Sequence, residues 1–294
     1  MRGLRASVII ATKDRAHYLE QALRSLSEQI AGPAFEVVIV DNGSTDTTSQ
    51  VVKNAQAAYP FTITSIFEAT PNRGAARNRG IAAVTGELVV FMDDDVWVPP
   101  GFLAAHSAAH EGHGTFAVSG PIINVPSYDE RPKPSIANYS RAFLCTCNVS
   151  ISREALHWVK GFDEQFDLYG WEDTELGVRL RENGVRGKFA WDAYLYHIKR
   201  PQEQTLEVTL QKTLEKAQMA ARFVKKNPSK RARMATGAYG FNLLRSKALA
   251  PKWMLPFFAG VASDKRFPAA LRSIARAQLL DAMYVAELER GLEQ

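Results

Sequence analysis

The stretch of sequence that decides the fold is LVVFMDDD, residues 88–95. Five apolar residues, typical of a buried strand, lead directly into three carboxylates. Adjacent carboxylates repel one another, and their removal from water costs free energy unless a positive charge neutralises them. A divalent cation with a phosphate on its far side would do this. The stretch therefore points to an enzyme that uses a nucleotide-activated substrate.

Strands and helices alternate along the sequence on the N-terminal side of this stretch. We expect strands at residues 7–11, 35–40 and 62–67, and helices at residues 17–29, 44–58 and 74–83. This alternation predicts an α/β fold in which helices cover a mainly parallel sheet. The next part of the chain is less regular, with strands expected at residues 144–151 and 193–197 and a Pro-rich loop at residues 125–137.

Polar side chains follow several of the predicted strands at the point where each strand ends. Thr12 and Arg15 follow the first strand, Asp41 follows the second, and residues 93–95 follow the fourth. The carboxyl ends of parallel strands meet at one edge of a sheet, which is where such folds bind their ligands. We therefore expect these residues to line one site.

Charge is unevenly distributed along the 294 residues. Residues 1–198 contain 18 Lys and Arg and 23 Asp and Glu, a net charge of −5, whereas residues 199–294 contain 18 and 8, a net charge of +10. From about residue 205 the apolar residues follow a helical period. This basic helical region should face an anionic partner. Two interpretations stay open: a membrane-surface element, or helices packed on the catalytic domain with a solvated basic face.

Cysteine content and hydropathy bear on location. Cys145 and Cys147 are too close in sequence for an ordinary disulfide, which favours a reducing compartment. The first residues lack the apolar segment of a signal peptide, and no apolar run of roughly 18 residues occurs. We expect a cytoplasmic protein, and the basic C-terminal region adds the option of peripheral contact with the inner face of the cell membrane. We expect no nucleic-acid partner.

Five motifs in order resemble glycosyltransferase family 2, whose members have the GT-A fold. The motifs are SVIIAT at residues 7–12, VDNGSTD at 40–46, NRGAARN at 72–78, DDD at 93–95 and WED at 171–173. The resemblance covers about residues 6–198. It implies a catalytic domain over residues 1–204, with a nucleotide-sugar-binding half at 1–98 and an acceptor-binding half at 99–204. Residues 205–294 form the basic helical C-terminal region.

The resemblance also implies roles for residues on the donor side. The DDD stretch corresponds to the family's DXD motif, so Asp95 should contact Mn²⁺ or Mg²⁺ directly. Asp93 should reach the ribose or a metal-bound water and counts with Asp95 among the metal residues, while Asp94 completes the donor site. A histidine at the position of His197 is a further metal ligand in some relatives, although a strand histidine can also be purely structural.

The nucleotide should contact four residues outside the DDD stretch. Asp41 matches the position that binds the base, and Thr12 and Arg15 line the same pocket. Asp41 could instead be a turn-forming residue before Asn-Gly. Arg77 should face the nucleotide or its diphosphate near a helix N-terminus, where anions are favoured. Arg73 and Arg79 are interpreted as surface charges.

The WED motif should carry the chemistry at the acceptor. By the match, Asp173 is the base that removes the proton of the acceptor hydroxyl, and Glu172 shapes the acceptor site. Acidic residues at this position can also serve only to cap a helix. His106, His110 and His113 have metal-ligand spacing, but neighbouring glycines indicate that the helix ends there, so we interpret them as solvated.

The leading hypothesis is a metal-dependent, inverting glycosyltransferase. It would move a sugar from a nucleotide donor, expected to be a UDP-sugar, to a saccharide or lipid-linked acceptor in polysaccharide or cell-envelope glycan synthesis. One alternative is a sugar nucleotidyltransferase, but residues 11–15, ATKDR, lack the glycine-rich loop of that class. The other is a non-catalytic subunit that has kept the fold, which the intact Asp95 and Asp173 argue against.

Overall fold

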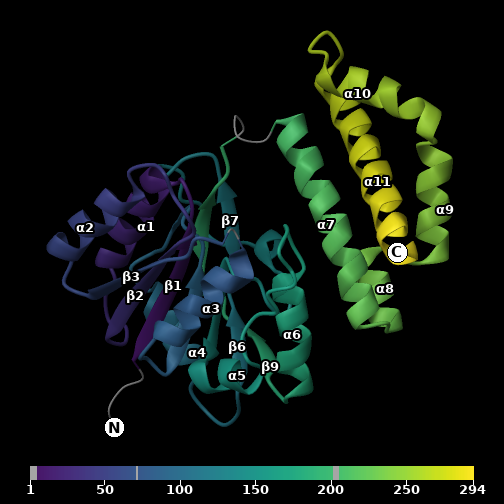
Figure 1. Ribbon diagram of the computed structural model, residues 1–294. Coiled ribbons are helices and arrows are strands. Elements are labelled where there is room, and N and C mark those ends of the chain that lie inside the picture. The colour runs from purple at the N-terminus through teal and green to yellow at the C-terminus, as the bar shows by residue number, and fades with distance from the viewer. Residues whose placement is uncertain (1–4, 71, 201–204) are drawn as a thin grey trace. The chain divides into compact units, whose positions relative to one another are not determined.

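The computed structural model describes residues 5–70, 72–200 and 205–294 (Figure 1). The chain divides into two compact units, one of residues 1–167 and 172–200 and the other of residues 168–171 and 201–294. The boundary predicted between residues 204 and 205 touches residues 201–204, which lie outside the described residues.

A seven-stranded sheet forms the centre of the first unit, with strand order β3-β2-β1-β4-β8-β6-β9. The strands are β1 Ala6–Thr12, β2 Phe35–Asp41, β3 Thr62–Phe67, β4 Leu88–Met92, β6 Phe116–Ser119, β8 Asn148–Ser152 and β9 Arg186–Phe189. Strands β3, β2, β1 and β4 run parallel, and β8 is antiparallel to both β4 and β6. The predicted α/β fold with a mixed, mainly parallel sheet is confirmed.

Helices cover both faces of this sheet (Figure 1). They are α1 Ala16–Ser27, α2 Thr48–Ala58, α3 Arg73–Ala83, α4 Phe102–Ala109, α5 Arg153–Trp158 and α6 Glu172–Glu182. Alternating strand residues enter two separate cores. Ile10 and its neighbours on one face pack against Leu19 and Leu23 of α1, whereas Ile9 and Phe91 on the other face pack with α3, α5 and α6. Burial of each such Leu or Phe stabilises the fold by roughly 1.5–3 kcal/mol.

A smaller sheet brings a distant segment to the end of β4. It contains β5 Val96–Trp97, β7 Ile122–Val125 and β10 Leu195–Ile198, in the order β5-β10-β7. His197 pairs with Val96, and the Ile198 amide donates to the Asp95 carbonyl over 2.8 Å. The fold thereby places His197 beside the carboxylates, although about 100 residues separate them in sequence.

Two strand predictions in the middle of the chain need correction. The strand expected at residues 144–151 is confined to β8, which begins at Asn148 because residues 145–148 form a turn, closed by the Asn148 amide on the Cys145 carbonyl. The strand expected at residues 193–197 begins two residues later, at Leu195. The Pro-rich loop contains one short 3₁₀ helix, η1 Ile136–Asn138.

The second unit is helical, as predicted for the C-terminal region. Its helices are α7 Leu206–Lys226, α8 Lys230–Thr236, α9 Gly240–Leu249, η3 Lys252–Met254, α10 Leu255–Ser263 and α11 Ala269–Glu293. Small residues let α7 and α11 approach closely, since a Cβ atom on Gly291 would lie 2.7 Å from that of Ala221. Trp171 stacks on Phe223 of α7 with ring centroids 5.4 Å apart. Within the described residues, no helix is both long and apolar enough to cross a membrane.

Candidate functional site

Arg15 joins the end of β1 to the end of β4. Its Nη2 atom donates to Asp95 Oδ2 over 2.8 Å, and its Nη1 atom lies 3.4 Å from Asp94 Oδ1. The guanidinium also lies over the ring of Tyr18, 4.6 Å from its centroid. Thr12 Oγ1 donates to Asp94 Oδ2 over 2.7 Å. Three predicted donor-site residues, Thr12, Arg15 and Asp94, are therefore in contact with one another or with Asp95.

The adjacent carboxylates Asp94 and Asp95 have different environments. Burial raises the pKa of Asp94 to about 7, in spite of the opposing charge of Arg15. Burial acts in the same direction on Asp95, but His197 and Arg15 outweigh it and hold the pKa of Asp95 well below its usual range. Asp95 is therefore the carboxylate of this pair that stays ionised at neutral pH, which a metal ligand requires.

Asp93, on the other side of the DDD stretch, faces Arg77. Arg77 Nη2 lies 3.6 Å from Asp93 Oδ1, and Arg77 Nη1 donates to Glu172 Oε1 over 3.1 Å. Burial would lower the pKa of Arg77, but Glu172, Asp93 and Asp173 together raise it. Arg77 thus links Asp93 of the DDD stretch to Glu172 of the WED motif. Its predicted contact with the nucleotide stays a prediction.

The N-terminus of α3 fixes the position of Arg77. Asn72 caps the helix, because its Oδ1 accepts from the Ala75 amide over 3.0 Å, and its Nδ2 donates to the Glu164 carbonyl over 2.7 Å. Arg77 follows one turn later and is buried, with its guanidinium 5.7 Å from the centroid of the Phe162 ring. Arg79 on the same helix is exposed and pairs with Glu68, as expected of a surface charge.

Glu172 and Asp173 form the first turn of α6. Burial and the charge of Glu172 raise the pKa of Asp173 to about 6, against the opposing effect of Arg77. Asp173 Oδ1 accepts from the Thr174 amide over 2.7 Å, whereas Glu172 Oε2 is buried without a hydrogen-bond partner among the described residues. Glu172 therefore keeps one buried oxygen that neither Arg77 nor a helix amide occupies.

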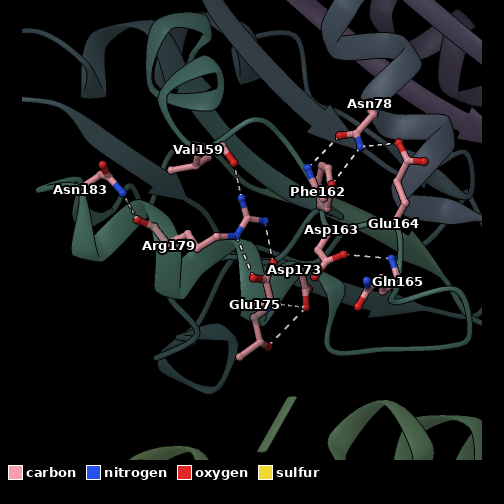
Figure 2. A network of polar contacts seen from close by, with 11 residues as sticks. Asn78, Val159, Phe162, Asp163, Glu164, Gln165, Asp173, Glu175, Arg179 and Asn183 are labelled. Atoms are coloured by element: carbon pink, nitrogen blue, oxygen red, sulfur yellow. Dashed lines mark hydrogen bonds and ion pairs between the residues drawn. The ribbon is translucent and has the colours of Figure 1, made fainter. Parts of the chain in front are cut away.

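The backbone is strained immediately before these acids. Trp171 has a φ of 73°, a conformation that is costly for a bulky residue, by about 1–3 kcal/mol. A polar network around α6 restrains Glu172 and Asp173 from the C-terminal side of this turn (Figure 2). In it, Arg179 pairs with Glu175 over 2.6 Å and donates to the Val159 carbonyl, while Asn78 of α3 bonds to both backbone groups of Phe162. The strained backbone at Trp171 and this network together fix the direction in which Glu172 and Asp173, in the first turn of α6, point.

A cation could bind where Asp93, Cys147 and His197 converge. The ligand atoms of these three residues all lie within 4.8 Å of one another. Asp95 Oδ1, which has no hydrogen-bond donor in the described parts of the chain, lies 3.1 Å from His197 Nε2. Carboxylate oxygens with one imidazole nitrogen suit Mn²⁺ or Mg²⁺. Burial raises the pKa of the Cys147 thiol well above its ordinary value, which makes it a weak ligand. The residues present fit the predicted metal.

Asp41 ends β2 in a tight turn. Its Oδ1 accepts from the Ser44 amide over 2.8 Å, and Gly43 supplies the positive φ of 78° that the turn requires. Asp14 of the loop after β1 accepts from the Thr45 amide, which ties the two loops together. The turn-forming role of Asp41 is thus present, and its contact with the base stays a prediction.

The interpretation of His106 and His110 as solvated is wrong. His106 is fully buried, with its Nδ1 2.8 Å from Ser150 Oγ and its Nε2 2.9 Å from Asn148 Oδ1. Asn148 uses its amide group on two backbone carbonyls, so its Oδ1 accepts from His106, and Ser150 must donate to the other ring nitrogen. Burial lowers the pKa of both histidines to about 4. They stay neutral and fix the start of β8 next to Cys147.

The profile of Glycosyl transferase family 2 matches residues 7–160. The chain belongs to this family. A second profile, the N-terminal domain of galactosyltransferase, matches residues 131–211. Among curated relatives, the validoxylamine A glucosyltransferase of Streptomyces hygroscopicus subsp. limoneus is 28% identical over 264 residues, which are 76% of this chain and 57% of that protein. The chain spans about three-fifths of the length of the curated relatives that it matches over at least 260 residues.

Solved structures share the fold of this family 2 member at low sequence identity. The mannosyltransferase PcManGT of Pyrobaculum calidifontis, solved with GDP-Man and Mn²⁺, has a TM-score of 0.66 at 20% identity and covers 99% of this chain and 87% of its own. The structure of TarS residues 1–349 of S. aureus, solved with UDP-GlcNAc, has a TM-score of 0.60 at 21% identity. The match covers 97% of this chain and 91% of the TarS chain. These matches confirm the predicted GT-A fold.

Arg77 provides a test of how the carboxylates are held together. Replacement by Met leaves Glu172 and Asp93 without their shared counter-charge, so Arg77→Met should lower the free energy of unfolding by about 3–5 kcal/mol. Chemical denaturation followed by circular dichroism measures this. Arg79→Met, on the same helix but exposed, is the matched control and should behave like the wild type. Equal effects of the two substitutions would contradict the account.

Proposed function

We propose that the protein transfers a sugar from a nucleotide-sugar donor to an acceptor hydroxyl, with inversion at the anomeric carbon. The observation that carries this is the convergence of Asp95, Asp93 and His197. Arg77 joins this cluster, through Asp93, to Glu172, which precedes Asp173 in α6. The first set has the chemistry of a cation site for a diphosphate. The second set offers a base for an incoming hydroxyl. Membership of family 2 supports the same reaction.

We propose that Asp95, Asp93 and His197 hold Mn²⁺ or Mg²⁺ when the donor binds. The cation would supply Lewis-acid stabilisation of the negative charge that develops on the leaving diphosphate. His197 and Arg15 flank Asp95, so its carboxylate is oriented before the donor arrives. Arg15, which contacts both Asp94 and Asp95, brings a positive charge to the edge where the diphosphate would lie.

Asp173 is the base in this proposal. As the acceptor oxygen attacks the anomeric carbon, its proton passes to Asp173 while the bond from that carbon to the diphosphate oxygen breaks. A base with a pKa raised to about 6 is ionised at neutral pH and still binds a proton well, which suits this step. The Arg77–Glu172 pair holds the first turn of α6 in place. Direct attack by the acceptor oxygen, with no covalent enzyme intermediate, makes the reaction a single displacement.

A UDP-sugar is the donor that we propose. TarS, whose fold this chain shares, was solved with UDP-GlcNAc, and PcManGT with GDP-Man, so a GDP-sugar is the second candidate. We propose a saccharide or lipid-linked acceptor in polysaccharide or cell-envelope glycan synthesis, which fits relatives described as acting in O-antigen biosynthesis and on poly(ribitol-phosphate).

A panel of nucleotide sugars tests the reaction class. With Mn²⁺ present, the wild-type protein should release nucleoside diphosphate from at least one donor, and addition of EDTA should stop the release. A nucleotidyltransferase would release pyrophosphate from a nucleoside triphosphate and a sugar phosphate instead. A non-catalytic subunit would release neither product, and either of these outcomes would contradict the proposal.

Removal of the proposed base separates chemistry from binding. Asp173→Asn keeps the size of the side chain but cannot accept the proton, so turnover should fall on the order of 10²–10⁴-fold. Binding of UDP, measured by calorimetry with Mn²⁺, should be unchanged. Asp167→Asn, at an exposed position six residues earlier, is the control and should retain normal turnover. Near-normal turnover of Asp173→Asn would show that another group acts as the base.

We also propose that the second unit contacts an anionic membrane surface. Large apolar side chains on α9, η3, α10 and the start of α11 are exposed, with Trp253 79% and Phe241 76% accessible. Exposed apolar patches of this kind usually mark an interaction site. The net charge of +10 over residues 199–294 favours a surface of anionic lipids. This proposal places the protein in the cytoplasm, at the inner face of the cell membrane.

Vesicle binding tests this contact. The full chain should co-sediment with vesicles that contain phosphatidylglycerol and much less with pure phosphatidylcholine. The double substitution Trp253→Ser and Phe257→Ser should weaken the binding, because it removes two exposed anchors. Trp158→Ser removes an exposed tryptophan from the first unit and serves as the control. Equal binding of the double variant and the wild type would exclude this surface.

A further inference from the structure

Three aromatic side chains of the first unit, Tyr139, Phe189 and Trp191, contact one another, and Tyr139 and Trp191 stay exposed while Phe189 is half-buried. Ring centroids are 4.9 Å apart for Tyr139 and Phe189, 5.1 Å for Phe189 and Trp191, and 6.2 Å for Tyr139 and Trp191. Tyr139 is 49% exposed and Trp191 41%. Aromatic rings left in water contribute little to stability, so their clustering at the surface calls for another explanation. We refer to these three residues as the aromatic platform.

Strand register places the platform at the same sheet edge as the carboxylates. Phe91, two residues before Asp93, pairs with Val149 of β8, which pairs with Ser119 of β6, which pairs with Phe189 of β9. Neighbouring strands lie about 4.8 Å apart, so Phe189 is about 14 Å across the sheet from the end of β4. Paired residues point to the same face, which here is the face that α3 and α6 cover.

Phe143 packs between the helix that carries the proposed base and the strand that leads to the platform. A Cβ atom on Gly187, two residues before Phe189 in β9, would lie 3.1 Å from the Phe143 ring, and so would one on Gly177 of α6. Gly177 follows Asp173 by four residues and lies on the same side of the helix. Phe143 therefore packs between the helix that carries Asp173 and the strand that ends at Phe189.

The loop that carries Tyr139 is closed by hydrogen bonds of its own. The Ser135 amide donates to Asn138 Oδ1 over 2.9 Å, which closes the 3₁₀ turn η1, and the Tyr139 amide donates to the Ile136 carbonyl over 3.1 Å. Trp191 follows β9 directly, and the Ala190 amide between them donates to the Ser119 carbonyl over 2.9 Å. A prearranged surface loses little conformational entropy when it binds.

We propose that the aromatic platform is an acceptor subsite that binds a saccharide unit beyond the one that receives the transferred sugar. The apolar C–H face of a pyranose ring stacks on aromatic rings, and the Tyr hydroxyl and Trp N–H can bond its hydroxyl groups. The inference rests on the proposed glycosyl transfer and assigns the acceptor class as an oligosaccharide chain. The offset of about 14 Å between the end of β4 and Phe189 is longer than one pyranose ring.

Direct binding of defined saccharides tests the subsite. Saturation-transfer NMR is run on the full chain with methyl glucoside and methyl mannoside, and with β-1,4- and α-1,4-linked glucose oligomers of two to four units. The oligomers should bind, and Trp191→Ala and Tyr139→Ala should each weaken binding on the order of tenfold, the size expected from loss of about 1.4 kcal/mol. Trp191→Phe keeps an aromatic face and should recover most of the affinity.

Trp158→Ala is the matched control, because Trp158 is 47% exposed in the same unit and lies outside the platform. It should bind saccharides like the wild type. Failure of every saccharide to bind, or wild-type binding by Trp191→Ala, would overturn the proposal. Donor turnover by the wild type is measured separately. Its absence alongside normal saccharide binding would refute glycosyl transfer and leave the platform as a saccharide site, whereas normal turnover without platform-dependent binding would refute the subsite alone.

Discussion

The structure depends on the way in which parallel strands gather carboxylates at one edge of a sheet. Strands β1, β2 and β4 end together, and α6 begins near the same place, so Asp93, Asp94, Asp95, Glu172 and Asp173 crowd a small volume. Their mutual repulsion has to be offset before the fold is stable. Two arginines from the first unit do this: Arg15 from the loop after β1 and Arg77 from α3.

The arginines divide the carboxylates into two groups with different chemistry. Arg15 and His197 keep Asp95 ionised, which suits a cation, while burial leaves Asp94 with a raised pKa. Arg77 pairs with Glu172 and leaves Asp173, whose pKa burial raises to about 6, as the proposed base. The acids at one sheet edge therefore differ in pKa because their burial and their neighbouring charges differ, although their side chains are chemically alike.

The predictable part of the site follows directly from strand ends. Thr12, Arg15, Asp41 and Asp93 could be placed together because an apolar run shows where each parallel strand stops and geometry aligns the ends. The place of Cys147 beside the possible cation site was not predicted. The residues before β8 form a turn, whereas their apolar sequence resembles a strand. The burial of His106 depends on Ser150 and Asn148, over 40 residues away, and no local pattern encodes that contact. The aromatic platform brings Tyr139, from the loop after η1, to Trp191, which follows β9, and sequence periodicity does not reveal such a contact.

The central claim is that the crowded edge holds a divalent cation against a nucleoside diphosphate. The most direct measurement is a crystal structure of the protein soaked with Mn²⁺ and UDP, with anomalous diffraction recorded at the manganese edge. The account predicts one strong anomalous peak within coordination distance of Asp95 and His197, with the diphosphate on its far side. A peak elsewhere, or UDP bound with no metal at these residues, would contradict it.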